Sequence, residues 1–160
     1  DGFDESFFCY CEDVDLGYRL QLAGESTVVV PEAVVRHVGS ASSGGPKSEF
    51  AVFHGTRNRF WVLVKDTPAL LLPVVLPLHV LAVILIATRP ANRDRAPAMW
   101  RGLSAGLKDL PRVLRTRKAV QARRRASTWA VARAMTWNPR DLRGRRPVIR
   151  PLRPNRPGEP

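Results

Sequence analysis

Cysteine and histidine are scarce in this chain of 160 residues, which contains two cysteines and three histidines. Cys9 and Cys11 are separated by one residue, so a disulfide between them would be strained. Two thiols with His37 or His54 could form a metal site, but the chain has no second closely spaced cysteine pair to complete it. We therefore expect reduced, buried cysteines, which fit a protein in the cytosol.

The chain also lacks an initiator methionine and a signal peptide, and it opens at Asp1. We therefore expect it to be the C-terminal part of a longer protein. Residues 1–68 carry ten acidic and six basic side chains, whereas residues 89–160 carry four acidic and twenty basic ones. The composition indicates an acidic globular part, then an uncharged apolar segment, then a basic tail.

Three carboxylates are crowded near the start of the chain, at Glu12, Asp13 and Asp15, directly after an aromatic run. Neighbouring carboxylates repel one another, and the unpaired N–H groups of a helix N-terminus relieve that repulsion. Apolar residues then recur at helical spacing as far as Gly24, a residue type that commonly ends helices. The pattern predicts a helix over residues 12–23, buried on two sides, with its acidic end at the edge of a packed core.

Four motifs stand within roughly residues 1–65: Gly2-Phe3-Asp4-Glu5, Phe7-Phe8, Glu12-Asp13-Val14-Asp15-Leu16 with Arg19, and Pro31-Glu32-Ala33-Val34-Val35-Arg36-His37. Together they resemble the acceptor-side segment of family-2 glycosyltransferases. Within the family, the chain is most similar to membrane-associated bacterial enzymes of the rhamnosyltransferase-like kind. The resemblance implies an α/β fold, namely the C-terminal part of a GT-A (Rossmann-like) nucleotide-sugar transferase domain. It also implies that the fragment alone is inactive, because the nucleotide-binding strands would precede Asp1.

The implied reaction is the inverting transfer of a sugar from a nucleotide-sugar donor to a glycan or lipid-linked acceptor. By resemblance, Asp13 is the general base, and Glu12 holds the acceptor or orients the base. His37 corresponds to a ligand of a divalent metal, Mg²⁺ or Mn²⁺. Asp15 and Arg19 would support the acceptor site or the helix itself, and their spacing favours an i, i+4 salt bridge. Without the resemblance, the acidic cluster fits a capped surface helix and His37 fits a hydrogen-bonded core residue.

Two valine-rich stretches follow the predicted helix, over residues 27–30 and 33–38, with Pro31 between them. Runs of β-branched residues bounded by proline and glycine are typical of buried strands. We therefore expect two short strands there, as at the end of an α/β domain.

Residues 69–87 form an apolar run of 19 residues without a charged side chain. As a helix, this run would reach about 28 Å, close to the roughly 30 Å hydrocarbon layer of a bilayer. Pro73 and Pro77 would kink it. A single crossing would separate the predicted catalytic head from the basic tail, and both are expected on the cytoplasmic side. We therefore favour a bent segment that enters the cytoplasmic leaflet and returns.

The expected organisation has five parts: residues 1–48 end the catalytic domain, 49–68 form an interfacial amphipathic helix, 69–88 form the apolar membrane segment, 89–137 form basic amphipathic helices, and 138–160 form a disordered tail rich in Arg and Pro. The aromatic residues of the segment 49–68 fit a core helix equally well. Anionic lipid at the cytoplasmic face of a bacterial membrane is the expected partner of the basic helices. Nucleic-acid binding is disfavoured, because no recognised module is present. A non-enzymatic scaffold bound to the membrane surface is the alternative to a transferase.

Overall fold

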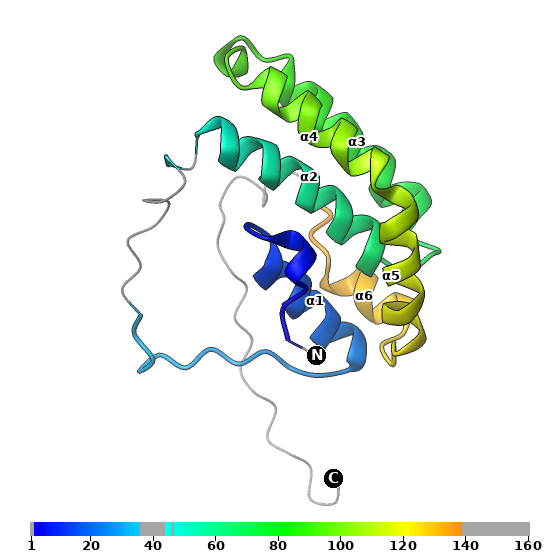
Figure 1. Cartoon of the computed structure of the whole chain (residues 1–160). Helices are drawn as coiled ribbons and strands as arrows, with labels where there is room; N and C mark the ends of the chain where they lie inside the picture. The colour runs from blue at the N-terminus through cyan, green and yellow to red at the C-terminus, as the bar shows by residue number, and fades with distance from the viewer. Residues whose placement is uncertain (1, 36–43, 46, 139–160) are drawn as a thin grey trace, which may run out of the picture.

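The computed structural model describes residues 2–35, 44–45 and 47–138, which form six α-helices and two short 3₁₀ helices (Figure 1). In chain order these are η1 (Glu5–Phe7), α1 (Glu12–Ala23), α2 (Glu49–Asp66), α3 (Leu72–Ala87), η3 (Pro90–Asn92), α4 (Ala96–Lys108), α5 (Leu110–Ala122) and α6 (Thr128–Ala134). Helix α2 runs through the middle, with α1 on one side and the pair of α3 and α4 on the other.

The expected α/β fold is wrong for the described part of the chain, which is helical and contains no strand. Val28, Val29 and Val30, which we expected in a buried strand, are 54%, 60% and 56% exposed in irregular backbone. In the second expected strand, residues 33–35 are also irregular, and residues 36–38 lie outside the described residues. The expectation failed because a β-branched run forms a strand only beside a neighbour that shares its hydrogen bonds.

Helix α1 has the predicted bounds. Its first turn contains the three acidic residues, and it ends at Gly24, whose φ of +89° is the left-handed conformation that favours glycine. Leu22 is buried, whereas Val14 and Leu20 are exposed. Within the described part of the chain, α1 is therefore covered on one side. The expectation that it is buried on two sides is wrong for that part of the chain.

Helix α2 forms the core together with α4. The rings of Phe60 and Trp61 are buried, and the backbones of the two helices approach closely at two glycines of α4. A Cβ atom at Gly102 would lie 2.6 Å from a carbonyl oxygen of α2, and one at Gly106 would lie 2.9 Å from the ring of Phe60. The aromatic side of α2 therefore packs against protein, as in a core helix.

Helix α3 takes up 16 residues of the apolar run. Pro73 lies in its first turn, where a missing N–H group leaves no acceptor unpaired, whereas Pro77 lies inside the helix and removes one of its backbone hydrogen bonds. The chain then turns through η3, and α4 returns beside α3. In the described part of the chain, no helix has the length and apolar character needed to cross a bilayer.

Helix α5 holds the C-terminal end of α2. The Nη1 of Arg117 donates to the carbonyl oxygens of Val64 and Thr67, each at 2.6 Å. The Nε2 of Gln121 donates to the carbonyl oxygen of Asp66 at 2.8 Å. Since the last carbonyl groups of a helix have no partner within the helix, these two side chains complete the hydrogen bonding of α2 and fix α5 against it.

Candidate functional site

The chain enters α1 through a tight loop in which three residues other than glycine have a positive φ. Phe8, Tyr10 and Cys11 have φ values of 59°, 68° and 67°. Such conformations cost a non-glycine residue about 1–3 kcal/mol each, and they persist only where surrounding contacts hold them. Contacts from elsewhere in the fold must therefore hold this loop.

Asn58 of α2 supplies the main contact. Its side chain is fully buried. The Nδ2 atom donates to the carbonyl oxygens of three loop residues, at 3.1 Å (Phe7), 2.7 Å (Cys9) and 2.8 Å (Tyr10). The Oδ1 atom accepts a hydrogen bond from Nε of Arg57 at 2.9 Å, which fixes the orientation of the amide. One side chain of α2 therefore holds the backbone that leads into the acidic turn of α1.

Phe7 anchors the same loop in the core. Its ring is buried and meets the ring of Trp61 edge to face, with 5.8 Å between the centroids. The guanidinium groups of Arg57 and Arg112 lie over the Trp61 ring at 4.2 Å and 4.4 Å. These contacts combine apolar burial with cation–π attraction, so the start of α1 is built into the core around α2.

Glu12 and Asp13, the predicted orienting residue and base, lie in the first turn of α1. Asp13 is exposed, and its Oδ1 accepts the backbone N–H of Val14 at 2.8 Å. Among the described residues, no Lys or Arg forms an ion pair with Asp13. Glu12 is half-buried, and its Oε2 is enclosed without a hydrogen-bond donor from the described residues. A carboxylate that is open to solvent and not neutralised by a salt bridge can accept a proton from an incoming group.

Asp15 and Arg19 form the predicted i, i+4 ion pair, with 2.8 Å between Oδ2 and Nε. Asp15 is fully buried and also contacts the ammonium group of Lys65, which binds Asp4 at 2.7 Å. Arg19 donates a further hydrogen bond to the carbonyl oxygen of Gly2 at 2.8 Å. The pair thus belongs to an ionic cluster that ties α1 and the first residues of the chain to α2.

Asp66, at the end of α2, is a buried carboxyl group that the sequence analysis missed. Burial and the neighbouring Asp15 carboxylate raise the pKa of Asp66 to about 8, so the group is largely protonated at neutral pH. At Asp4, burial raises the pKa, but the hydrogen bonds from Lys65 and Ser6 and the charge of Lys65 together outweigh burial and lower the pKa to about 2. In the sequence, Lys65 and Asp66 look like an exposed pair at a helix end, and no local signal marks them or Asn58 as buried.

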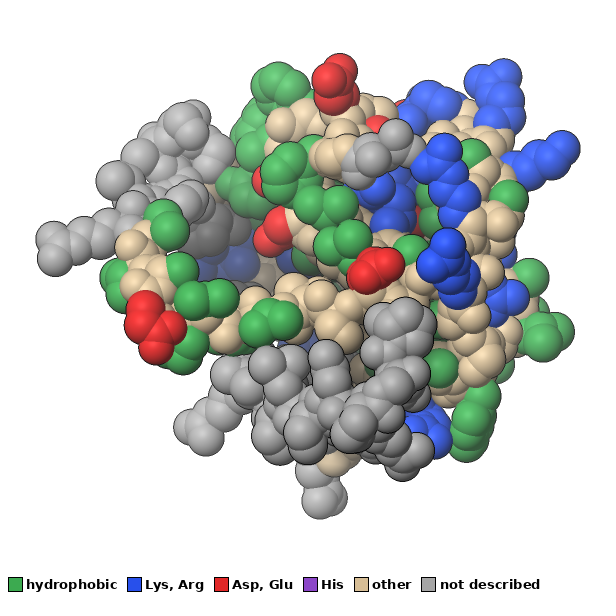
Figure 2. Space-filling model, turned by 90° about the horizontal axis from the view of Figure 1, so that it is seen from below, with side chains coloured by type: hydrophobic (Ala, Val, Ile, Leu, Met, Phe, Trp, Pro, Cys, Tyr) green, Lys and Arg blue, Asp and Glu red, His purple; other side chains and the backbone are tan. Residues whose placement is uncertain are grey.

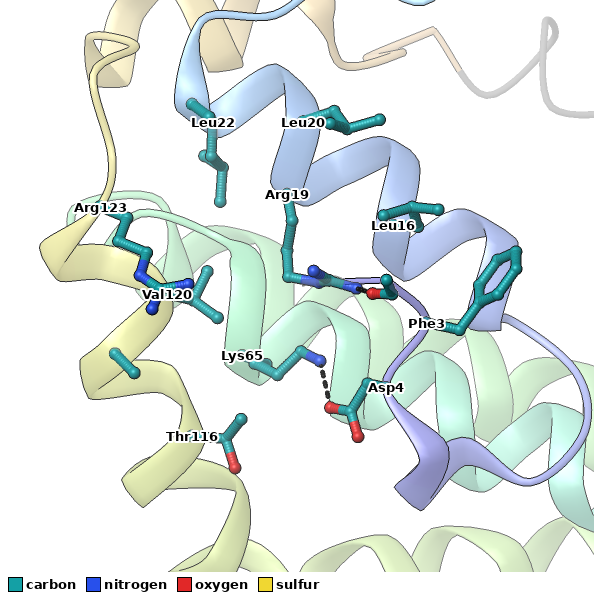
Figure 3. A pocket seen from close by; sticks show the side chains of 13 residues that line it. Phe3, Asp4, Leu16, Arg19, Leu20, Leu22, Lys65, Thr116, Val120 and Arg123 are labelled. Atoms are coloured by element: carbon teal, nitrogen blue, oxygen red, sulfur yellow. Dashed lines mark hydrogen bonds and ion pairs between the residues drawn. The ribbon is translucent and has the colours of Figure 1, made fainter.

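A cavity of about 390 Å³ lies beside α1, where α1, α2 and α5 meet (Figure 3). Its apolar lining includes Phe3, Leu16, Leu20, Leu22 and Val120. Arg19, Lys65 and Arg123 reach toward it from the three helices. Leu16 and Leu20 follow Asp13 by three and seven residues, so all three lie on one face of α1. The cavity therefore combines an aliphatic wall with cationic groups. Asp13 is not among the residues that line it, but it shares a face of α1 with Leu16 and Leu20.

The predicted metal ligand, His37, lies outside the described residues. Cys9 and Cys11 are free thiols, as expected, but both are half-buried rather than buried; partial burial raises the pKa of the Cys11 thiol. His54 is engaged by Arg57, whose Nη2 lies 3.0 Å from its Nδ1. Within residues 2–35, 44–45 and 47–138, no three His, Cys, Asp or Glu side chains are grouped to hold a metal ion.

Comparison with known proteins gives one partial relationship. Two proteins of Mycobacterium tuberculosis, from strains CDC 1551 / Oshkosh and ATCC 25618 / H37Rv, are each 52% identical to this chain over 54 residues. Both are named N-acetylglucosaminyl-diphospho-decaprenol L-rhamnosyltransferase. The match covers 33% of this chain and 18% of each relative, so the chain is a partial homologue of a glycosyltransferase. No family model and no solved structure matches the chain.

Proposed function

We propose that the protein to which this chain belongs transfers a sugar from a nucleotide-sugar donor to a lipid-linked or polymeric glycan, with inversion at the anomeric carbon. The partial identity to a rhamnosyltransferase supports the reaction class. The observation that carries the proposal is the Asp13 carboxylate, which is exposed and outside any described ion pair, at the end of a helix fixed in the core.

In the proposed step, the acceptor hydroxyl attacks the anomeric carbon of the donor sugar from the side opposite the diphosphate. A bond forms between the acceptor oxygen and this carbon, and the bond from the carbon to the phosphate oxygen breaks. The Asp13 carboxylate takes the hydroxyl proton, and the nucleoside diphosphate leaves with the bonding electron pair. Glu12, the first residue of the same helix, holds the acceptor or orients the base.

The acceptor would lie along the cavity beside α1. Leu16 and Leu20 give this cavity an aliphatic wall on the face of α1 that also carries Asp13. An acceptor that joins an apolar chain to a sugar through phosphate groups could rest its apolar part on this wall and direct a sugar hydroxyl toward Asp13. Arg123 adds positive charge at the cavity, which suits the phosphate groups, whereas Arg19 and Lys65 are paired with Asp15 and Asp4.

A divalent metal, Mg²⁺ or Mn²⁺, remains part of the proposal through His37. When bound, it would supply positive charge to the departing diphosphate. Among the described residues, no other set of side chains fits such an ion. We further propose that the site works at the cytoplasmic face of the membrane, where a lipid-linked acceptor would be found.

The proposal is tested by incubating the full-length protein with a radiolabelled L-rhamnosyl nucleotide and an N-acetylglucosaminyl-diphospho-polyprenol acceptor. The expected result is a labelled lipid product that forms only when both substrates and a divalent metal are present. Polymeric glycan acceptors and other nucleotide sugars, tested in parallel, define the specificity. Hydrolysis of the nucleotide sugar without transfer to any acceptor would contradict the proposal, and so would binding of acceptor without turnover.

A further inference from the structure

Helix α3 presents an apolar ridge that no described residue covers. Val74, Leu78, Leu81 and Leu85 follow one another at spacings of four, three and four residues, and each is at least 50% exposed. On the opposite side of the helix, Val83 and Ala87 are buried against the bundle. A soluble helix normally turns polar residues outward, whereas α3 is apolar on its inner and outer faces. The outward ridge is therefore fitted to an apolar environment.

The ridge continues into a second apolar patch at the start of α3. Leu70, in the turn before the helix, is 80% exposed, and Leu71 shares a hollow with Trp129 and Trp137 of the C-terminal segment. The indole N–H of Trp137 is satisfied by the carbonyl oxygen of Ala132 at 2.7 Å, so its ring can face an apolar phase without losing a hydrogen bond. Exposed tryptophans beside aliphatic side chains are typical of surfaces that sit at the boundary between lipid and water.

Basic side chains flank both ends of this surface. Near the start of α3, a second hollow beside Ala69 is lined by Arg117, Lys118 and Arg124. Beyond the end of α3, Arg89 and Arg93 follow within a few residues. The described residues 89–138 carry thirteen Lys and Arg side chains but two Asp side chains. Figure 2 shows basic side chains gathered along the side of the molecule where α5 lies in Figure 1.

We propose that this surface, made of the α3 ridge (Val74, Leu78, Leu81, Leu85), Leu70, Trp129 and Trp137 with their flanking cations, docks on the surface of an anionic bilayer. Helix α3 lies parallel to the membrane, its ridge enters the boundary of the acyl chains, and the cations at both ends contact lipid headgroups. Helix α3 thus binds the membrane from one side and does not cross it.

A second copy of the chain is a poorer occupant of the same surface. Packing two α3 ridges together, in either direction, would bring the basic groups of one copy against those of the other. Such like-charge contacts oppose association, whereas anionic headgroups neutralise both ends at once. The charge on the surface therefore selects lipid over self-association.

The test is sedimentation of the full-length protein with vesicles of phosphatidylcholine containing about 30 mol% phosphatidylglycerol. The variant Leu78→Gln/Leu85→Gln is expected to lower the partition coefficient about tenfold or more, because two leucines no longer enter the apolar layer. The control Val28→Gln/Val30→Gln also replaces two exposed aliphatic side chains, at positions away from α3, and it should bind like the wild type. Circular dichroism verifies that both variants keep their helical content.

Charge is tested with Lys118→Glu, which should weaken binding several-fold, against Lys47→Glu, which makes the same change at the start of α2 and should have little effect. Trp129→Phe/Trp137→Phe should lose most of the fluorescence quenching by brominated lipids, whereas Trp100→Phe should retain it. Unchanged vesicle binding in the Leu78/Leu85 variant would overturn the proposal. So would equal binding to vesicles of phosphatidylcholine alone, or a wild-type dimer that these leucine substitutions dissociate.

The docking proposal extends the proposed function by naming the surface through which a lipid-linked acceptor is approached. The two can fail separately. The Leu78/Leu85 variant should still transfer sugar to a short-chain, water-soluble acceptor at the wild-type rate. Vesicle binding without any transfer would overturn the transferase proposal alone, and transfer by a protein that does not bind vesicles would overturn the docking proposal alone.

Discussion

Asn58→Ala should destabilise the fold more than the substitution of any exposed polar residue in α2. The reason is that the amide of this one side chain donates to three carbonyl groups of the loop before α1. The carbonyl oxygens of Phe7, Cys9 and Tyr10 lie 3.1, 2.7 and 2.8 Å from Nδ2. Two N–H groups are thus shared among three acceptors. The loss of two buried hydrogen bonds, with their acceptors left enclosed, should lower the free energy of unfolding by about 3 kcal/mol. Relaxation of the strained loop offsets part of this loss.

Urea unfolding followed by circular dichroism measures this loss directly. Asn58→Asp keeps the size of the side chain but turns a carboxylate toward three carbonyl oxygens, so it should be less stable than Asn58→Ala at neutral pH. Asn92→Ala is the matched control, since Asn92 makes one exposed amide hydrogen bond, to the carbonyl oxygen of Ile86 at 2.8 Å, and should cost about 1 kcal/mol or less. A loss for Asn58→Ala no larger than that of Asn92→Ala would refute the assignment of Asn58 as the residue that holds the loop.

Two further predictions concern packing and pH. Gly102→Ala should lower the free energy of unfolding in urea by about 1–3 kcal/mol, because the added Cβ would meet a carbonyl oxygen of α2. Gly17→Ala, where the added Cβ has nothing within 4 Å, should raise it by about 0.5–1 kcal/mol. Similar effects at both sites would contradict the close approach of α2 and α4. Because the pKa of Asp66 is raised from 3.8 to about 8, the folded state retains a proton that the unfolded chain releases, so the free energy of unfolding should fall between about pH 4 and pH 8. Asp66→Asn should flatten this decline, and an equally steep decline in the variant would exclude Asp66 as its source.

Local signals in the sequence predicted α1 and its ion pair. The acidic first turn, the helical spacing of apolar residues and the stop at Gly24 all act within a few residues, and the structure has the helix at Glu12–Ala23. The pair of Asp15 and Arg19 depends only on their i, i+4 spacing. Such features require no knowledge of the rest of the fold.

Features that depend on distant parts of the chain could not be predicted. Residues 27–30 have the composition of a strand, but a strand needs a neighbour, and among the described residues none lies beside them. Asn58 and Asp66 are polar residues in a helix whose burial follows from the packing of the loop before α1, α4 and α5 around it. The sequence offers no signal for them, because burial of a polar side chain is decided by which elements meet there.

The most direct test of the central claim, that Asp13 takes the acceptor proton, is the transfer rate of Asp13→Asn in the full-length protein at saturating donor. Glu25→Gln, an exposed carboxylate just beyond α1, is the control. We expect Asp13→Asn to lower transfer by about 10²–10⁴-fold with donor affinity unchanged, and Glu25→Gln to act like the wild type. Transfer by Asp13→Asn within about tenfold of the wild-type rate would contradict the claim.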